Sequence, residues 1–220
     1  MLINSFPAKA FGTNCWVIAP GEGEECVIVD PGMPDLSLEV FEIVERFNLK
    51  PVATIITHGH LDHTFSVVPV CEGYSIPAYI HVEDRILLTH PEKALSPEFT
   101  AGLVGSSFSE PPQVRILRND DQIELVGMTF RAIHAPGHTR GSLIFTLGEE
   151  FVITGDVLFA GSIGRTDLPS GSAKDMESTL RKKIWPLPDA MRVLPGHGAE
   201  TTIGRERRSN PHLQNLGRRS

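Results

Sequence analysis

The chain has 220 residues, of which 40% are hydrophobic and 21% are charged. This composition is typical of one globular domain and excludes a disordered or fibrous chain. The net charge of -7 argues against nucleic acid as the main ligand. The sequence has no apolar run of the ~18 residues that a membrane span needs, and residues 1–7 lack the basic start of a signal peptide. We therefore expect a cytoplasmic protein with neither a nucleic-acid nor a membrane partner.

The first half of the chain is rich in short β-type runs separated by turns. Apolar and β-branched residues predict strands over five ranges, which are Leu2–Phe6, Cys15–Ala19, Cys26–Val29, Val52–Thr57 and Ala78–His81. Apolar residues at helical spacing predict a helix over Asp35–Leu49, closed by Pro51. Residues 96–112 carry Ser, Gly, Glu and Pro without a period, which indicates a long surface loop or a lid.

The second half repeats this β-rich organisation. Further strands are predicted over Gln113–Arg118, Met128–Ile133, Ser142–Leu147, Phe151–Thr154 and Arg192–Leu194, and a helix over Ala173–Ile184. Hairpin-like strand pairs outnumber βαβ units, so we expect a layered α/β protein with mixed sheets over residues 1–220. Residues 205–220 contain five arginines and one glutamate. We interpret them as a solvated helix end or basic tail, with anion recognition or a subunit contact as the alternative.

The three cysteines stand singly, without the Cys-x-x-Cys spacing of a metal or redox motif. Cys15 and Cys26 lie beside apolar residues, which favours buried strand positions over a nucleophilic role. An odd number of cysteines in a chain of this size indicates reduced thiols rather than a disulfide framework.

The strongest feature of the sequence is the run Thr57-His58-Gly59-His60-Leu61-Asp62-His63, which follows the apolar residues 52–56. Four potential metal ligands fall within it: His58, His60, Asp62 and His63. His58 and His60 are two positions apart, so in extended backbone they point to the same side. The alternative, a solvated loop that is rich in histidine by accident, does not explain an aspartate and three histidines at this spacing.

Further ligand-type residues follow other apolar runs. Asp30, His138, Asp156 and His197 each come directly after a predicted strand or after a short Gly-containing turn. Loops at strand ends converge on one edge of a sheet, so we expect these side chains to meet the histidine-rich run. Without Asp30 the set has seven nitrogen and oxygen ligands. One closed zinc site needs four, so the number indicates two adjacent ions with open positions.

These motifs resemble the metallo-β-lactamase-fold hydrolases in order and spacing: HxHxDH at 58–63, Gly137-His138, Gly155-Asp156 and Gly196-His197. Within that superfamily, residues 161–167 and 201–211 are similar to those of the single-domain bacterial type II glyoxalases. The resemblance implies an αββα sandwich of two mixed sheets. It also implies hydrolysis of S-2-hydroxyacyl-thiol esters such as S-lactoylglutathione, through attack by a hydroxide that two metals share.

The resemblance also implies roles for individual residues. His58, His60 and His138 would hold the first metal, Asp62, His63 and His197 the second, and Asp156 would bridge both, so that Asp62 and Asp156 are the catalytic carboxylates. Asp30 would accept a hydrogen bond from a ligand histidine or a backbone N–H; its alternative is a simple Asp-Pro-Gly turn. Histidine and aspartate without cysteine accept zinc, which we expect first, and also iron or manganese.

The reaction type is supported by what the ligand motifs lack. No Lys, Tyr or Glu stands beside them as a proton donor, and a thiolate with a thiol pKa near ~8.5 leaves without one. A thioester therefore fits better than an amide. Arg165, in the loop after Asp156, is predicted either to bind a substrate carboxylate or to brace the loop by pairing with Asp167.

Two other functions compete with this one. Gly164-Arg165-Thr166-Asp167 also resembles the persulfide dioxygenases of the superfamily, in which one iron would be held by His58, His138 and Asp156. The Pro195-Gly196-His197-Gly198 motif favours the hydrolases. A ribonuclease relative would need extra domains and basic surfaces, and a binding-only relative is expected to have lost ligands, whereas all seven are present.

Overall fold

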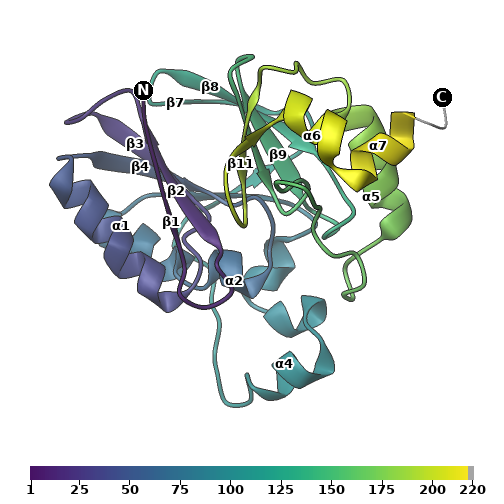
Figure 1. The fold of residues 1–220 in the computed structure, drawn as a ribbon. Helices are drawn as coiled ribbons and strands as arrows, with labels where there is room; N and C mark the ends of the chain where they lie inside the picture. The colour runs from purple at the N-terminus through teal and green to yellow at the C-terminus, as the bar shows by residue number, and fades with distance from the viewer. Residues whose placement is uncertain (218–220) are drawn as a thin grey trace.

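Two six-stranded β-sheets face each other in the computed structural model, which describes residues 1–217, and helices cover both outer faces (Figure 1). The first sheet has the order β1-β2-β3-β4-β5-β6. Its strands are β1 (Leu2–Pro7), β2 (Asn14–Ala19), β3 (Glu25–Val29), β4 (Lys50–Ile55), β5 (Ala78–His81) and β6 (Val114–Leu117). The strands β1 to β3 pair antiparallel, and β3 to β6 pair in parallel.

The second sheet has the order β12-β11-β10-β9-β8-β7. Its strands are β7 (Gln122–Leu125), β8 (Met128–His134), β9 (Leu143–Leu147), β10 (Phe151–Gly155), β11 (Arg192–Pro195) and β12 (Thr201–Thr202). Strands β7 to β10 are antiparallel, while β10 and β11 are parallel. Both sheets are therefore mixed, as the sequence predicts.

Helices lie on the outer faces of both sheets and between strands. Those that follow strands of the first sheet are α1 (Pro34–Arg46), α2 (Leu61–Thr64), α3 (Val67–Tyr74) and α4 (Pro97–Ala101), with 3₁₀ turns at Arg85–Leu88 and Pro91–Ala94. Those near the second sheet are α5 (Ala173–Thr179), which continues into a π turn at Leu180–Ile184, and α6 (Ile203–Ser209) and α7 (Pro211–Gly217). No helix within residues 1–217 is long and apolar enough to cross a membrane.

Three apolar layers hold the sandwich together. Between the sheets, residues such as Ile55 of β4 pack against Phe145 of β9. Val40 of α1 and Val70 of α3 cover the outer face of the first sheet, and a third cluster joins α5, α6 and α7 to the second sheet. Because β2 and β10 are covered on both faces, every residue of these strands is buried, which explains their largely apolar sequence.

The predicted element boundaries hold to within a few residues, but the proline that we expected to end the first helix lies in the following strand. Helix α1 ends at Arg46, and Asn48 adopts a left-handed φ of 51° that reverses the chain. Pro51 lies one turn further on, inside β4. Proline, which has no N–H to donate, is tolerated here because it lies at the start of β4, where the pairing with β3 is irregular. Strand β7 has only four residues and was not predicted.

Two segments differ from the sequence-based expectation. The range 96–112 contains the short helix α4, which projects below the sandwich in Figure 1. Residues 205–217, expected to form a solvated helix end or tail, belong to α6 and α7, and the solvated part of that expectation is wrong because Leu213 and Leu216 are buried against the second sheet's outer layer. Arg205 and Arg208 of α6 are exposed, whereas Arg207 donates hydrogen bonds to the carbonyl oxygens of Trp185 and Leu187. The remainder of that range, 218–220, lies outside the described residues.

Candidate metal centre

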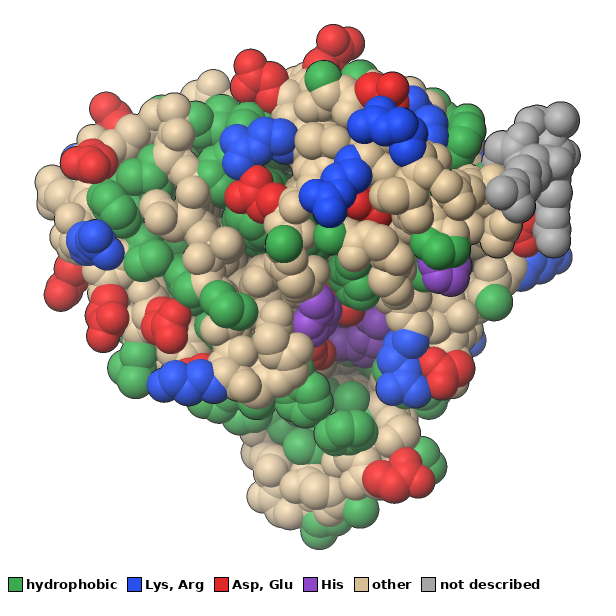
Figure 2. All heavy atoms as spheres, in the orientation of Figure 1, with side chains coloured by type: hydrophobic (Ala, Val, Ile, Leu, Met, Phe, Trp, Pro, Cys, Tyr) green, Lys and Arg blue, Asp and Glu red, His purple; other side chains and the backbone are tan. Residues whose placement is uncertain are grey.

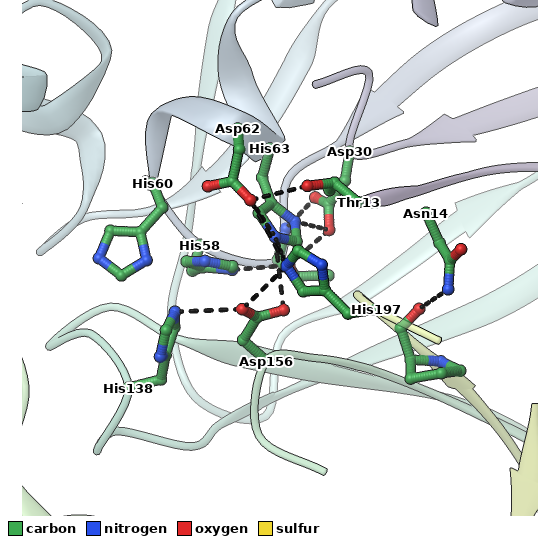
Figure 3. A network of polar contacts seen from close by, with 12 residues as sticks. Thr13, Asn14, Asp30, His58, His60, Asp62, His63, His138, Asp156 and His197 are labelled. Carbon is green, nitrogen blue, oxygen red and sulfur yellow. Dashed lines mark hydrogen bonds and ion pairs between the residues drawn. The ribbon is translucent and has the colours of Figure 1, made fainter. Parts of the chain in front are cut away.

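The predicted ligand residues follow the ends of strands at one edge of the sandwich. His58 and His60 come after β4, and α2 then carries Asp62 and His63. His138, Asp156 and His197 follow β8, β10 and β11 respectively. Strand β8 runs in the same direction as β10 because both are antiparallel to β9, and β11 is parallel to β10. The three loops therefore leave the second sheet at the same edge and meet the histidine-rich run of the first (Figure 3).

The first group of donors consists of His58, His60 and His138. All three side chains are buried, and they offer ligand atoms that lie within 4.8 Å of one another. The Nε2 atoms of these three histidines are buried without a hydrogen-bond partner. Buried polar atoms are nearly always satisfied in folded proteins, so three orphaned nitrogens at one point indicate a ligand that is a cation.

The second group consists of Asp62, His63 and His197, whose donor atoms also lie within 4.8 Å of one another. The Nε2 atoms of His63 and His197 are 3.4 Å apart. Asp156 lies between the two groups: its Oδ2 is 3.3 Å from His138 Nε2 and 3.4 Å from His197 Nε2 (Figure 3). A carboxylate in this position can contribute to two adjacent cation sites.

Hydrogen bonds at the outer ring nitrogens orient three of the histidines. The Nδ1 of His63 is 3.0 Å from Asp30 Oδ2, that of His138 is 2.8 Å from the carbonyl oxygen of Arg165, and that of His197 is 3.1 Å from the carbonyl oxygen of Phe11. These oxygens are acceptors only, so each Nδ1 carries the proton and donates it. In the neutral ring, which is the form that binds a metal, the Nε2 lone pair then faces the centre, which is the arrangement that metal-ligating histidines show.

Asp30 is the support beneath the centre that the sequence suggested. Its Oδ1 accepts a hydrogen bond from the Thr57 backbone N–H at 2.7 Å, and its Oδ2 accepts one from the Thr57 hydroxyl at 2.6 Å. The same Oδ2 receives the Nδ1 proton of His63. Asp30 also adopts a left-handed φ of 50°, which turns the chain after β3. One buried carboxylate therefore both shapes the turn and aligns a ligand candidate.

Sequence reasoning missed Asp84, a buried carboxylate that joins two of the ligand loops. Its Oδ2 accepts hydrogen bonds from the Gly59 N–H at 2.8 Å and from the Thr139 hydroxyl at 2.6 Å. Its Oδ1 accepts one from the Gly141 N–H at 2.7 Å. Asp84 thus links the loop of His58 and His60 to the loop of His138. The only sequence signal was an acidic residue shortly after β5, which is too weak to single out.

Thr13 is a second residue that the sequence did not reveal. Its hydroxyl donates a hydrogen bond of 2.7 Å to Asp62 Oδ2.

Two glycines explain how closely the backbone approaches Asp156. A Cβ added at Gly196 would collide with Asp156 Oδ1, and one added at Gly164 would collide with the backbone oxygen of Asp156. The glycine before His197 is therefore required by space.

The electrostatics of the centre favour metal-binding protonation states in the first group. Burial lowers the pKa of His58 well below its usual value and that of His60 to about 3, so both rings are neutral at pH 7. Burial alone would raise the pKa of Asp156, but the neighbouring His63 and His138 outweigh it and hold that pKa well below its usual value. For His197, burial is outweighed by hydrogen bonds to Asp156 and Asp62, which raise its pKa to about 9.

Arg165 lies in the loop after Asp156, as expected, and its guanidinium is paired. Its Nε and Nη2 donate hydrogen bonds of 2.8 and 2.7 Å to the two carboxylate oxygens of Asp167. Of the two interpretations of Arg165, the structure shows the loop-bracing pair. Its backbone carbonyl, rather than its charge, contacts the centre through His138.

The donor set fits divalent cations. It combines imidazole nitrogens and carboxylate oxygens without a thiolate, a mixture that suits zinc, iron and manganese. Each of the two groups contributes three residues, with Asp156 between them, which leaves open positions for water and substrate.

The sequence matches the family model of the Metallo-beta-lactamase superfamily over residues 8–197. The chain belongs to this superfamily, which confirms both the resemblance read from the histidine motifs and the predicted sandwich of two mixed sheets. It is 43% identical over 225 residues to an uncharacterized protein of Mycobacterium tuberculosis, with 99% of this chain and 100% of that protein covered. It is 35% identical over 219 residues to hydroxyacylglutathione hydrolase GloC of Haemophilus influenzae, with 97% and 98% covered.

Solved structures show the same likeness. The crystal structure of the BLEG-1 B3 metallo-beta-lactamase superimposes with a TM-score of 0.83 at 33% identity, covering 96% of this chain and 99% of that one. The structure of TTHA1623 in a di-iron-bound form gives a TM-score of 0.79 at 33% identity, covering 96% and 100%. The relatives thus include a hydrolase and a protein that holds two irons.

Proposed function

We propose that this protein is a binuclear metal-dependent hydrolase that cleaves thioesters, with S-2-hydroxyacyl thiols such as S-lactoylglutathione as the reference substrates. The observation that carries the proposal is the pair of donor groups around Asp156, three members of which have orphaned buried nitrogens. The 35% identity to the hydroxyacylglutathione hydrolase GloC supports a thioester as the bond that is cleaved.

In this proposal His58, His60 and His138 hold the first metal, and Asp62, His63 and His197 hold the second. Asp156 contributes to both. Held by these residues, two divalent ions would supply an activated water and Lewis-acid polarisation of the substrate carbonyl. Asp30, through His63, and the carbonyl of Arg165, through His138, keep the ligand nitrogens aimed at the centre. Zinc is the first candidate for the metal, with iron or manganese as alternatives.

The residues around the centre favour a thioester over an amide. The described residues that line the adjoining cavity include no Lys, Tyr, Glu or Cys. An amine leaving group must be protonated as the bond breaks, whereas a thiolate leaves without a proton because its conjugate acid has a pKa near ~8.5. The described residues that line the cavity therefore suit thioester cleavage, in which the leaving thiolate needs no Lys, Tyr, Glu or Cys as proton donor.

The proposal is tested by elemental analysis of protein reconstituted with zinc, iron or manganese, combined with thiol release from a panel of thioesters. We expect two ions per chain and release of thiol from S-lactoylglutathione. His58→Ala and His197→Ala are expected to lose metal and at least ~100-fold in kcat/KM. His90→Ala serves as the control, because His90 is exposed and lies outside the centre.

Two outcomes contradict the proposal. Full metal loading without cleavage of any thioester would exclude the reaction. Oxygen uptake with glutathione persulfide, together with one iron per chain and no thiol release, would instead support a persulfide dioxygenase. A β-lactam is included as the amide substrate, and its preferential cleavage would overturn the leaving-group argument.

A further inference from the structure

A cavity of about 460 Å³ adjoins the centre and has a strongly apolar wall. Its floor includes His60, His138 and Asp156. The wall includes Phe11, Phe65, Phe99, Leu103, Phe159 and Leu168. Figure 2 shows the purple histidines in a hollow, with green hydrophobic side chains between them and the projection that α4 forms in Figure 1.

The wall is built from aromatic side chains that are costly to leave in water. Phe11, Phe65 and Phe99 are 58%, 41% and 52% exposed, although each lies beside the centre. The rings of Phe11 and Phe99 are 5.8 Å apart, so the β1–β2 loop and α4 meet across the cavity. Exposed aromatic residues that gather around a functional cavity mark a surface that an apolar ligand covers.

The cavity offers no free cation for a charged ligand. Arg165 is the one Lys or Arg among the described residues that line it, and both carboxylate oxygens of Asp167 already accept from its guanidinium. The peptide part of glutathione carries carboxylates at neutral pH, and a carboxylate in such a wall would stay without a partner.

We infer that the group which this cavity receives is an uncharged, apolar part of the thioester substrate, an aliphatic or aromatic chain, rather than the charged peptide of glutathione. This inference rests on the proposed function for the bond that is cleaved, and adds which substrates are preferred. The chain packs against the wall to which Phe11 and Phe99 contribute, while the carbonyl lies at the floor beside Asp156. Its source is either the acyl group or the thiol, and the experiment separates the two.

The test uses two series of thioesters with the metal-loaded protein. One series lengthens a straight acyl chain on a fixed neutral thiol, and the other keeps the lactoyl group and lengthens a neutral thiol. We expect kcat/KM to rise about threefold for each added methylene in one series, through KM. That series identifies which side of the carbonyl occupies the cavity. S-lactoylglutathione is expected to fall below the longer members of that series.

Phe99→Ser tests the wall directly. The variant is expected to abolish the dependence of KM on chain length, because it replaces an apolar ring of the cavity wall with a small polar side chain. Val104→Ala is the matched control: Val104 lies on the same segment, is 86% exposed and does not line this cavity. Unchanged chain-length dependence in Phe99→Ser, or none in the wild type, overturns the inference.

A binding measurement separates this inference from the proposed function. Calorimetric titration with the neutral alcohols butan-1-ol, hexan-1-ol and octan-1-ol requires no turnover. Tighter binding with each longer chain, lost in Phe99→Ser and kept in Val104→Ala, supports an apolar cavity even if no thioester is cleaved. Equal affinities across the series refute it even if S-lactoylglutathione is a good substrate.

Discussion

Asp84 illustrates at the scale of single residues how the centre is held in place. Its two carboxylate oxygens accept three hydrogen bonds, from Gly59, Thr139 and Gly141, and these donors belong to the two loops that carry the first donor group. A carboxylate is well suited to this position because it only accepts. A side chain that carries an N–H donor at this position would place that donor against the N–H and O–H donors of the two loops, and no hydrogen bond could form between them.

The substitution Asp84→Asn is therefore expected to disturb the centre without removing a ligand. The amide NH₂ would replace one acceptor oxygen, so the two loops would separate, and we expect metal affinity to fall about 10- to 100-fold. Competition with a chelating dye measures this affinity apart from turnover. Glu83→Gln, at the exposed neighbouring position, is the control. Wild-type metal affinity in Asp84→Asn would show that the link has no role in binding.

Arg165 provides a second prediction at the residue scale. Asp167→Asn removes one charge of the pair and frees the guanidinium at the cavity mouth. An exposed arginine–carboxylate contact contributes up to ~1 kcal/mol, so KM for S-lactoylglutathione is expected to fall roughly fivefold. KM for a neutral thioester should stay unchanged. If KM changes equally for both substrates, the Arg165–Asp167 pair affects catalysis through the conformation of the loop and not through attraction between Arg165 and a charged substrate.

At the scale of elements, α6 supports the loop that follows Asp156. The buried Glu206 accepts hydrogen bonds from the Thr201 hydroxyl at 2.6 Å, from the Gly161 N–H at 2.7 Å and from the Asn210 side-chain amide at 3.0 Å. Thr202 caps the same helix by accepting from the Arg205 N–H. The helix therefore joins the end of the chain to the loop that carries Gly164 and Arg165.

The substitution Glu206→Ala should destabilise the protein. Three donors would lose their acceptor in a buried place, and we expect the free energy of unfolding to fall by about 2–3 kcal/mol. Urea denaturation followed by circular dichroism measures the change. Arg205→Ala changes an exposed residue of the same helix and is expected to stay within ~0.5 kcal/mol of wild type. A similar loss in both variants would mean that helix propensity, not the buried network, is responsible.

At the scale of the whole molecule, the centre connects the two halves of the sandwich. His58, His60, Asp62 and His63 follow a strand of the first sheet, and His138, Asp156 and His197 follow strands of the second. A bound ion with ligands from both sides crosslinks the folded state. It also neutralises the negative carboxylates between them.

Removal of the metal with a chelator should consequently lower thermal stability. At a free metal concentration 100 times Kd, binding to the folded state adds about 2.7 kcal/mol, which corresponds to roughly 5–10 °C in Tm for a domain of this size. Differential scanning calorimetry before and after dialysis against chelator, and again after metal is restored, measures the effect. An unchanged Tm would contradict a centre that joins the two sheets.

The thiols provide another prediction for the whole fold. Cys15, Cys26 and Cys71 are buried and free, and burial raises their pKa values, to about 12 for Cys26 and about 11 for Cys71. At pH 8 the native protein should therefore not react with Ellman's reagent, whereas three thiols per chain should react after denaturation. Rapid reaction of the native protein would show that the apolar layer around these residues opens.

The sequence by itself determined the fold class and predicted a set of candidate ligands. The largely apolar runs of β2 and β10 could be recognised because both faces of these strands are covered. The seven candidate ligands could be recognised because metal binding requires specific residue types at specific spacings. Asp30 could be placed for the same reason, since it directly follows an apolar strand.

Only the tertiary structure decided what surrounds those ligands. Asp84, Thr13 and the apolar wall of Phe11 and Phe99 come from segments far apart in the chain, and no local pattern announces contacts between them. The pairing of Arg165 with Asp167, which the sequence left open, and the docking of α7 depended on packing. Local residue types specify which chemistry is available, whereas the packing of distant loops decides the shape and charge of the cavity that the substrate meets.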